Sequence, residues 1–464
     1  MRILLVVHGL PPAAAGGTEI YVHDLAHRLK ERRGDEVFIL TRESCADRPE
    51  MSVRQECRDG LHLTHVNNTF QTCSSFEQTY RNEAIRQIGG RLLEEIRPDV
   101  AHIHHLTGLG TDLVTELSAR TIPTVFTLND YWLLCQRGQL LDVDLERCAG
   151  PYPLGCARCM HLPVAASPVG RAAEGLLRLR PHLPVAAREP LRRVAFAALA
   201  NSRSAESASA PVEERLRHVR SICGLVDRFL APSRTLRDRF LALGIHAERL
   251  FLAEQGIEHR PFRGLRPTRA DRLRLGFVGS LIVSKAPHVL LEAVFDLPPE
   301  SVSVQVYGAY APYHGDDRYR GSLERLLSRP GVTHFGSVSH EHISVALASI
   351  DVLVVPSVWI ENAPFVIREA FRAGVPVVAS DLGGLAEMVT HERNGLLFPA
   401  GDVVALRKAL RRLLEEQGLL GRLRQGIPPV KSMEQDAAGQ RDARRHQHQL
   451  KEVEEEERDG NDAG

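Results

Sequence analysis

The stretch DVLVVPSVWIENAPFVIREAFRAGVPVVASDLGGLAEMV, residues 351–389, decides how this chain is predicted to fold. Its run Val352–Val355 is short and apolar, which is typical of a parallel strand buried on both faces. Pro364 suits the first position of a helix, where its missing N–H costs nothing. A second apolar run, Val375–Ala379, follows that helix. A strand, a helix and a strand in this order predict a parallel sheet covered by helices.

Two regions of the chain repeat this alternation. Further apolar runs that predict strands stand at Ile3–Val7, Val37–Leu40, Val100–Ile103, Thr124–Leu128, Val226–Pro232, Leu275–Val278 and Val302–Tyr307. The predicted fold class is α/β, with two doubly wound, Rossmann-like domains. We assign residues 1–225 to the first domain, 226–430 to the second, and 431–464 to a C-terminal helix and a charged, disordered tail. Residues from about 135 to 221 break the pattern and are predicted to form an insertion with connecting helices.

The overall composition limits the function. Lys plus Arg and Asp plus Glu each number 58 in 464 residues, so the formal net charge is zero. This balance excludes a uniformly basic nucleic-acid binder, and no nucleic-acid partner is expected. No apolar run reaches the ~18 residues that a transmembrane helix needs. Eight cysteines in so long a chain, without a convincing signal peptide, predict a cytoplasmic protein rather than a disulfide scaffold.

The loop and helix inside the quoted stretch form a predicted anion site. The amides of Phe365 and Val366 stand in the first helical turn without intrahelical partners, and the helix dipole adds positive potential there. Glu361 precedes the helix, and Glu369 lies within its first two turns. A carboxylate can accept two hydrogen bonds from a diol such as a ribose. One polyol at each acid, with a diphosphate between them, matches the shape of a nucleotide sugar.

This stretch resembles the donor-site motif of the family 4 retaining glycosyltransferases, which have the GT-B fold. Five further segments resemble motifs of that family in the same order: Gly16-Gly17-Thr18-Glu19, Asp99 to His105, Ala231-Pro232-Ser233, Phe277-Val278-Gly279-Ser280 with Lys285, and Gly383-Gly384 with Glu387. The resemblance covers roughly residues 1–430.

The resemblance implies a transferase with a central cleft between its two domains. The second domain would hold a nucleotide-diphosphate sugar as donor, and the first would hold a glycan, lipid-linked or small-molecule acceptor. Glu369 would bind the donor ribose, Glu361 would contact the sugar, and Lys285 would meet the pyrophosphate as a point charge. The other donor-site residues are Gly16, Gly17 and Ser280, and Ser280 stands where many relatives have Arg. No catalytic cofactor is expected.

The acceptor side departs from the family at one position. Family members often carry a His-Asp pair where this chain reads Asn129-Asp130. Asn neither gains nor loses a proton near neutral pH, so it cannot be a general base. In the family the departing phosphate oxygen takes the acceptor proton, and no protein base is then obligatory. Asp130, His104 and His105 stay candidate acceptor-side groups, with a structural strand-end histidine as the alternative.

Four cysteines cluster in the predicted insertion. Cys135, Cys148, Cys156 and Cys159 are separated by twelve, seven and two residues. Four thiolates suit tetrahedral zinc, and a structural metal could hold a segment that lacks a core. Reduced, unliganded thiols and a disulfide or redox role are the alternatives.

An Arg-rich stretch runs from Arg171 to Arg220 among Leu, Val and Ala. It could rest on anionic lipid, as a peripheral contact at the inner face of a membrane. The alternative is a solvated helical face whose Arg stems cover apolar surface.

Three other functions stay open on the sequence alone. A sugar-nucleotide epimerase of the same fold would convert the nucleotide sugar without an acceptor. A non-catalytic protein would bind the nucleotide sugar and form no product, as Asn129 and Ser280 make conceivable. A nicotinamide oxidoreductase is disfavoured, because no G-x-G-x-x-G follows the first strand.

Overall fold

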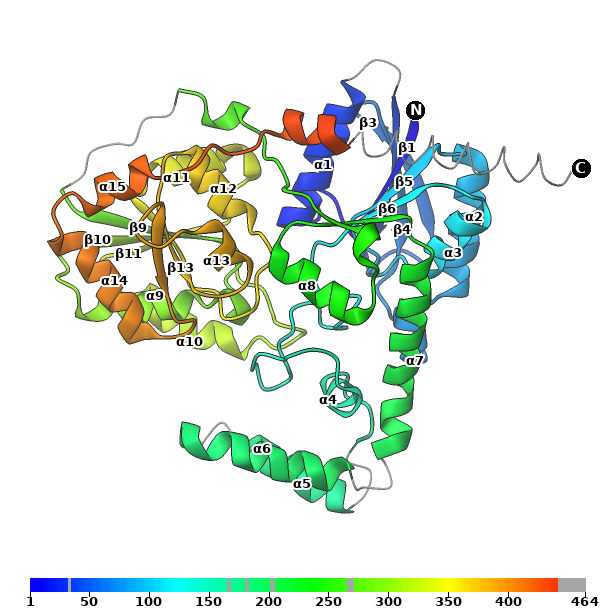
Figure 1. Ribbon diagram of the computed structural model, residues 1–464, viewed down its shortest axis with the longest axis horizontal. Coiled ribbons are helices and arrows are strands. Elements are labelled where there is room, and N and C mark those ends of the chain that lie inside the picture. Colours follow the sequence, from blue (N-terminus) through cyan, green and yellow to red (C-terminus); the bar gives the residue numbers. More distant parts are fainter. Residues whose placement is uncertain (32–34, 165–167, 180–182, 201–204, 265–270, 441–464) are drawn as a thin grey trace, which may run out of the picture.

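The computed structural model describes residues 1–31, 35–164, 168–179, 183–200, 205–264 and 271–440. Two helix-covered sheets lie side by side, the first on the right and the second on the left of Figure 1. Every predicted strand overlaps an observed one, so the α/β prediction with two doubly wound domains is confirmed.

The first sheet has the order β3-β4-β2-β1-β5-β6-β7-β8, and all of its pairs are parallel except β3 with β4. Its strands are β1 (Arg2–Val7), β2 (Glu36–Glu43), β3 (Val53–Arg58), β4 (Leu61–Asn67), β5 (Val100–Ile103), β6 (Thr124–Thr127), β7 (Arg228–Ala231) and β8 (Leu250–Leu252). The helices of this domain are α1 (Gly17–Lys30), α2 (Glu83–Ile96), α3 (Asp112–Ala119) and α8 (Arg234–Leu243).

The second sheet has the order β11-β10-β9-β12-β13-β14, and all of its pairs are parallel. Its strands are β9 (Leu273–Val278), β10 (Val302–Tyr307), β11 (Val332–Gly336), β12 (Val352–Val355), β13 (Val377–Ser380) and β14 (Gly395–Phe398). Its helices are α9 (Pro287–Ala293), α10 (Arg318–Leu327), α11 (Ile343–Ala348), α12 (Phe365–Arg372), α13 (Gly384–Met388), α14 (Val403–Glu415) and α15 (Leu419–Gln425).

The inner strands of each sheet are buried on both faces, which explains why they read as continuous apolar runs, whereas the edge strands β3 and β11 are partly exposed. In β1, Ile3 and Leu5 pack with residues of α1, whereas Leu4 and Val6 pack with residues of α2 and α3. Successive side chains point to opposite faces of a strand, so one apolar run serves two cores.

The domain boundary differs from the predicted one. β7 and β8 pair with the first sheet, although residues from 226 onward had been assigned to the second domain. The second sheet begins only at β9, so the chain crosses between the domains after Leu252. An apolar run identifies a strand, but nothing in its sequence states which sheet it joins.

The chain returns to the first domain near its end. Residues 433–440 are helical, and Met433 and Ala437 join the apolar core that α1 covers. The Tyr21 hydroxyl donates to Asp436 Oδ2 at 2.7 Å. The predicted C-terminal helix is therefore present in part, and the charged tail predicted after it lies outside the described residues.

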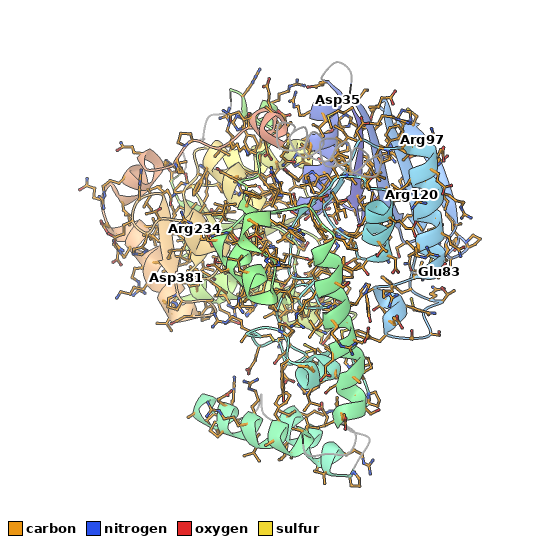
Figure 2. The ribbon with its side chains drawn as sticks, turned by 45° about the vertical axis from the view of Figure 1, so that its right-hand side comes forward. Asp35, Glu83, Arg97, Arg120, Arg234 and Asp381 are labelled. Atoms are coloured by element: carbon orange, nitrogen blue, oxygen red, sulfur yellow. The ribbon has the colours of Figure 1, made fainter. Side chains whose placement is uncertain are left out.

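The predicted insertion forms an arm that projects away from both sheets (Figures 1 and 2). It contains α4 (Pro153–Cys159), α5 (Pro168–Leu179), α6 (Val185–Ala200) and the long α7 (Ala205–Gly224), which leads back to β7. The arm has a small core of its own, to which Leu154, Leu177, Leu199 and Val212 contribute. None of the described helices is long and apolar enough to cross a membrane.

Candidate functional site

A cavity of about 590 Å³ lies between the two domains. In each sheet the strand order reverses beside the first strand of the domain, between β1 and β5 and between β9 and β12. Open α/β sheets bind ligands outside the carboxyl ends of the strands at such a point. His8, His105, Gly279 and Glu361 follow these four strands, and all four line the cavity. The cleft is thus lined by residues from the places where the strand order of each sheet reverses.

Most of the predicted site residues come together in this cavity. They are Gly16, Gly17, Asp130, Ser280, Lys285, Glu361, Phe365, Val366 and Glu369. The exception is His104, which is fully buried and whose ring packs 4.1 Å from that of His102. Beyond the end of β5, His104 enters the core and His105 faces the cleft. The acceptor-side role predicted for His104 is therefore not supported.

Gly17 permits a close approach of the two domains. A Cβ atom on this residue would stand 2.8 Å from Cδ2 of Phe365, the first residue of α12. The Phe365 ring also stacks on Tyr21 of α1, with 5.4 Å between the ring centroids. The glycine loop therefore lets α1 contact the N-terminal tip of α12.

The helix α12 begins one residue later than predicted. Pro364 is the N-cap, and Phe365 and Val366 occupy the first turn at the wall of the cavity. The loop before the helix rests on Gly384, whose amide donates to the Glu361 carbonyl at 2.7 Å. A Cβ on Gly384 would overlap the Asn362 carbonyl oxygen at 1.3 Å, so only glycine fits.

Lys285 and Glu361 form a hydrogen-bonded pair within the cavity. Lys285 ends the short helix η5 (Val283–Lys285), and its Nζ lies 2.6 Å from Glu361 Oε1. Ser357 Oγ donates to the same oxygen at 2.8 Å, and the glutamate is buried. The ammonium group also lies 5.6 Å from the Trp359 ring centre. A phosphate group could approach this lysine, because 29% of its side chain is exposed.

Glu369 lies further along α12 and is also buried. Burial raises the pKa of this carboxyl to about 7, although the nearby His340 opposes the rise. His340 belongs to the short helix η7 (His340–His342), and its Nδ1 lies 3.7 Å from Glu369 Oε1. A buried carboxyl that titrates near neutral pH in a cavity is a typical functional group.

The predicted acceptor side contains a chain of titratable groups on the first domain. His105 Nε2 lies 3.0 Å from Asp130 Oδ2, and Trp132 N donates to the other oxygen of Asp130 at 2.8 Å. Burial lowers the pKa of His105, but Asp130 outweighs it and raises this pKa above its ordinary value. The His8 ring packs at a tilt of 42° against that of His105, with 4.0 Å between the ring centroids, and His8 Nε2 lies 3.1 Å from Glu19 Oε1.

Asn129 forms hydrogen bonds at the position where a histidine could act as a base. Its Nδ2 donates to the His104 carbonyl at 3.0 Å, and its Oδ1 accepts from Gln255 Nε2 at 2.9 Å. Gln255 belongs to the segment that leads from the first domain to the second. The amide thus joins the end of the first sheet to the interdomain link.

Sequence reasoning assigned no role to several groups that line the cleft, namely His8, Glu19, Asp24 and His340. The position of His8 directly after β1 was a usable signal, because strand ends meet at one edge of a parallel sheet. His340 had no such signal, since it follows β11 in a segment without a recognisable motif.

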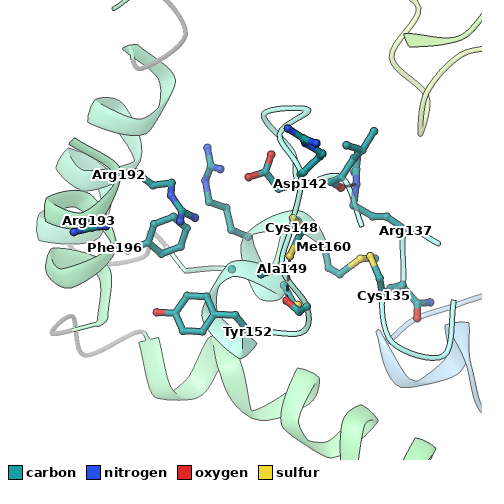
Figure 3. A pocket seen from close by; sticks show the side chains of 18 residues that line it. Cys135, Arg137, Asp142, Cys148, Ala149, Tyr152, Met160, Arg192, Arg193 and Phe196 are labelled. Atoms are coloured by element: carbon teal, nitrogen blue, oxygen red, sulfur yellow. Dashed lines mark hydrogen bonds between the residues drawn. The ribbon is translucent and has the colours of Figure 1, made fainter. Parts of the chain in front are cut away.

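The zinc site predicted on the four cysteines is not shown by the structure. Within the described part of the chain, no three His, Cys, Asp or Glu side chains are arranged to hold a metal ion. Cys156 and Cys159 lie one turn apart on α4, and the Cys148 thiol donates to the Gly150 carbonyl at 3.0 Å. All four thiols are free and line one pocket of the arm instead (Figure 3).

Two family models match the two halves of the chain. "Glycosyltransferase Family 4" matches residues 15–152, and "Glycosyl transferases group 1" matches residues 272–416. The sulfoquinovosyl transferase SQD2 of Arabidopsis thaliana is 30% identical over 213 residues, which are 43% of this chain and 40% of the relative. A D-inositol 3-phosphate glycosyltransferase of Streptomyces bingchenggensis is 29% identical over 262 residues, 52% of this chain and 56% of the relative. The chain spans about half the length of these curated relatives.

Solved structures share the arrangement of both domains. Sucrose-phosphate synthase from Thermosynechococcus elongatus aligns with a TM-score of 0.64 and 19% identity, over 96% of this chain and 98% of that one. Anabaena HepE in complex with UDP-glucose aligns with a TM-score of 0.57 and 16% identity, over 98% and 100% of the chains. These matches define the fold class as GT-B, the two-domain fold of glycosyltransferases. Within that fold class, the first half of the chain carries a domain of glycosyltransferase family 4 and the second half a domain of the group 1 glycosyl transferases.

Proposed function

We propose that this protein is a retaining glycosyltransferase that moves a sugar from a nucleotide-diphosphate sugar to an acceptor. The observation that carries the proposal is the meeting of Lys285, Glu361, Glu369 and the first turn of α12 in one interdomain cavity. This set offers a cation, two carboxylates and a helix N-terminus, which suit a diphosphate placed between two polyols.

The donor would bind along the second domain. Glu369 would accept hydrogen bonds from the ribose, and the amides at the start of α12 together with Lys285 would hold the diphosphate. The Lys285–Glu361 pair would then separate in part, leaving Glu361 to accept hydrogen bonds from the transferred sugar. UDP is the nucleotide that we propose to test first, because HepE was solved with UDP-glucose.

The reaction would need charge stabilisation more than a protein base. The bond from the anomeric carbon to the phosphate oxygen breaks, and the acceptor oxygen bonds to the same face of that carbon. The acceptor proton passes to the departing phosphate oxygen, whose charge Lys285 and the helix terminus stabilise. His105 and Asp130 would orient the acceptor from the opposite wall of the cleft. No catalytic cofactor is required in this scheme.

We also propose that the arm contacts an anionic membrane surface. Such a contact would place the protein at the inner face of a membrane, as the sequence predicts. Val169, Leu176 and Leu179 of α5 and Val194 of α6 are exposed large apolar side chains. Arg171, Arg178 and Arg193 are exposed on the same two helices. Exposed apolar and cationic side chains on one hairpin suit an anionic bilayer interface.

The test begins with thermal shifts in a panel of nucleotide sugars. A donor present at ~100 times its Kd stabilises the folded state by ~2.7 kcal/mol. Incubation with donor alone then separates the alternatives, because an epimerase converts the donor without any acceptor. A donor that binds but gives no product with any membrane or glycan fraction would favour the non-catalytic alternative.

A further inference from the structure

The arm contains a pocket that the catalytic cleft does not use. Its volume is about 510 Å³, within the range in which proteins enclose small ligands. The pocket lies between the segment from Cys135 to Met160 and one side of α6 (Figure 3). Tyr152 at its wall is 48% exposed, so the pocket opens to the solvent.

Most of the surface of this pocket is apolar. Leu141, Met160 and Phe196 contribute side chains, and Tyr152 and Phe196 lie together with 5.8 Å between their ring centroids. The cysteine thiols add soft apolar surface, because burial raises the pKa of Cys156 to about 11 and keeps it neutral at pH 7. Such walls suit a hydrocarbon chain.

The same pocket has a cationic lining. Five arginines line it, namely Arg137, Arg147, Arg158, Arg192 and Arg193, against the one aspartate Asp142. Arg158 is neutralised by Asp144 and Glu174, and Arg192 and Arg193 share the single Glu189. Counted against these three acids and Asp142, the five arginines keep a net positive charge of about one, which favours a ligand with an anionic head.

A short loop connects this pocket to the acceptor side of the cleft. Arg137 and Leu141 line the pocket, whereas Gln139 between them lines the cleft. The Gly138 carbonyl accepts a hydrogen bond from Tyr131 N at 3.0 Å, next to Asp130. A Cβ on Gly138 would stand 3.0 Å from Asp130 Oδ2. A ligand in the pocket therefore lies behind the wall that carries the candidate acceptor groups.

We propose that this pocket binds the hydrocarbon chain of an anionic lipid whose phosphate-bearing head is the sugar acceptor. This inference rests on the proposed transferase function and names the class of its acceptor. The arm would hold the chain while the head reaches past the loop from 135 to 141 into the cleft. The apolar and arginine-bearing hairpin of α5 and α6 would keep the pocket at the membrane surface, where such a lipid resides.

Calorimetric titration with hexyl, octyl, decyl and dodecyl phosphate, each below its micelle concentration, tests the pocket without any transfer reaction. The Kd should fall about fourfold for each added methylene until the pocket is full, and then stay constant. Dodecyl maltoside, which has a neutral head, should bind more weakly than dodecyl phosphate. A Kd that is independent of chain length, or equal affinity for both heads, would overturn the proposal.

Two variants locate the binding. Ala149→Trp fills the pocket from its rim, and Phe196→Asp places a carboxylate in its wall. Each should weaken dodecyl phosphate binding at least tenfold, whereas Ala172→Trp, on the exposed side of α5, should not. Unchanged binding in a folded Ala149→Trp protein would refute the assignment. One tightly bound zinc ion per chain, with no alkyl phosphate binding, would refute it as well.

Transfer to lipid separates a true acceptor from a bystander phospholipid. With donor and a membrane lipid extract, wild-type enzyme should form an organic-extractable sugar product, and Ala149→Trp should form at least tenfold less. Neutral diacylglycerol in phosphatidylcholine vesicles should yield no product. If it does, or if Ala149→Trp forms wild-type amounts, the acceptor class is wrong. If no nucleotide sugar raises the melting temperature of the wild-type protein, the transferase function itself is refuted.

Discussion

Asp24 and His340 join the two domains across the cleft. Asp24 Oδ2 on α1 lies 3.2 Å from Nε2 of His340 on η7, and the other ring nitrogen of His340 faces Glu369. Burial lowers the pKa of His340, but the Asp24 carboxylate outweighs it and raises this pKa above 6.5. The ring of His340 therefore connects an acid of the first domain to the ribose-binding acid proposed for the second.

Replacing this histidine should weaken donor binding. In His340→Asn, Glu369 loses the cation that favours its ionised form, so its pKa should rise further. The donor KM at pH 7 should increase several-fold and should recover in part at higher pH, where Glu369 ionises again. His342→Asn, on the same short helix but exposed, is the control. Identical pH profiles of KM in wild type and His340→Asn would contradict this link.

Glu369 should make the free protein less stable at higher pH. Below about pH 4.5 the carboxyl is protonated in both states, whereas from there to about pH 7 only the folded state keeps the proton. The free energy of unfolding should therefore fall as pH rises through this window, by up to about 3 kcal/mol from this group. Glu369→Gln should remove the decrease and should raise the donor KM.

Urea unfolding at pH 5 and pH 8, without donor, measures this effect. Glu369→Gln should gain stability over wild type at pH 8 and much less at pH 5. Glu415→Gln, whose side chain is 72% exposed, should follow the wild type at both values. A Glu369→Gln protein that binds donor as well as wild type would show that this carboxylate does not bind the ribose.

Lys285→Ala should lower kcat by ~10²-fold or more, because the leaving diphosphate loses its ammonium group. The variant also leaves Glu361 buried without its cation, so folding is checked by circular dichroism before kinetics. Lys408→Ala, at an exposed position of α14, provides the matched control. Wild-type turnover of Lys285→Ala would remove this lysine from the site.

Gly17→Ala should reduce kcat/KM by about tenfold or more. The added Cβ would stand 2.8 Å from the Phe365 ring, so the ring and the tip of α12 must shift. Small displacements of positioning groups slow catalysis strongly. Gly175→Ala is the control, because a Cβ there meets nothing within 4 Å, and a helical alanine should stabilise the arm slightly. Unchanged kinetics of Gly17→Ala would show that the domains adjust freely at this contact.

The sequence predicted the strands well because parallel strands buried on both faces are continuous apolar runs. The donor side was predictable for a related reason, since Glu361, Phe365 and Glu369 lie in one short segment whose geometry is local. The acceptor side depended on longer-range geometry. Whether His104 or His105 faces the cleft is decided by the direction of the chain just after β5, which residue types do not specify.

Other features depended on the tertiary structure alone. Asp24 and His340 are 316 positions apart, so no local pattern could pair them. The cysteine spacing allowed a metal site, but the orientations of Cys148 and of the two cysteines on α4 place the thiols around a pocket. Likewise, β7 joins the first sheet because α7 carries the chain back to it, which the apolar run itself could not reveal.

The return of the chain to the first domain governs how the two halves can move. Ile257 pairs with Ser432 in parallel, so the outgoing and returning segments run as a two-stranded strap. Ile257 N donates to the Lys431 carbonyl at 3.1 Å, and Met433 N donates to the Ile257 carbonyl at 2.7 Å. A double strap resists twisting more than a single linker does, so opening of the cleft should follow one bending axis. A chain that ends at residue 430 would lack the returning segment, so the two domains could also twist relative to one another. It would also expose Tyr21, some four hundred positions earlier in the sequence.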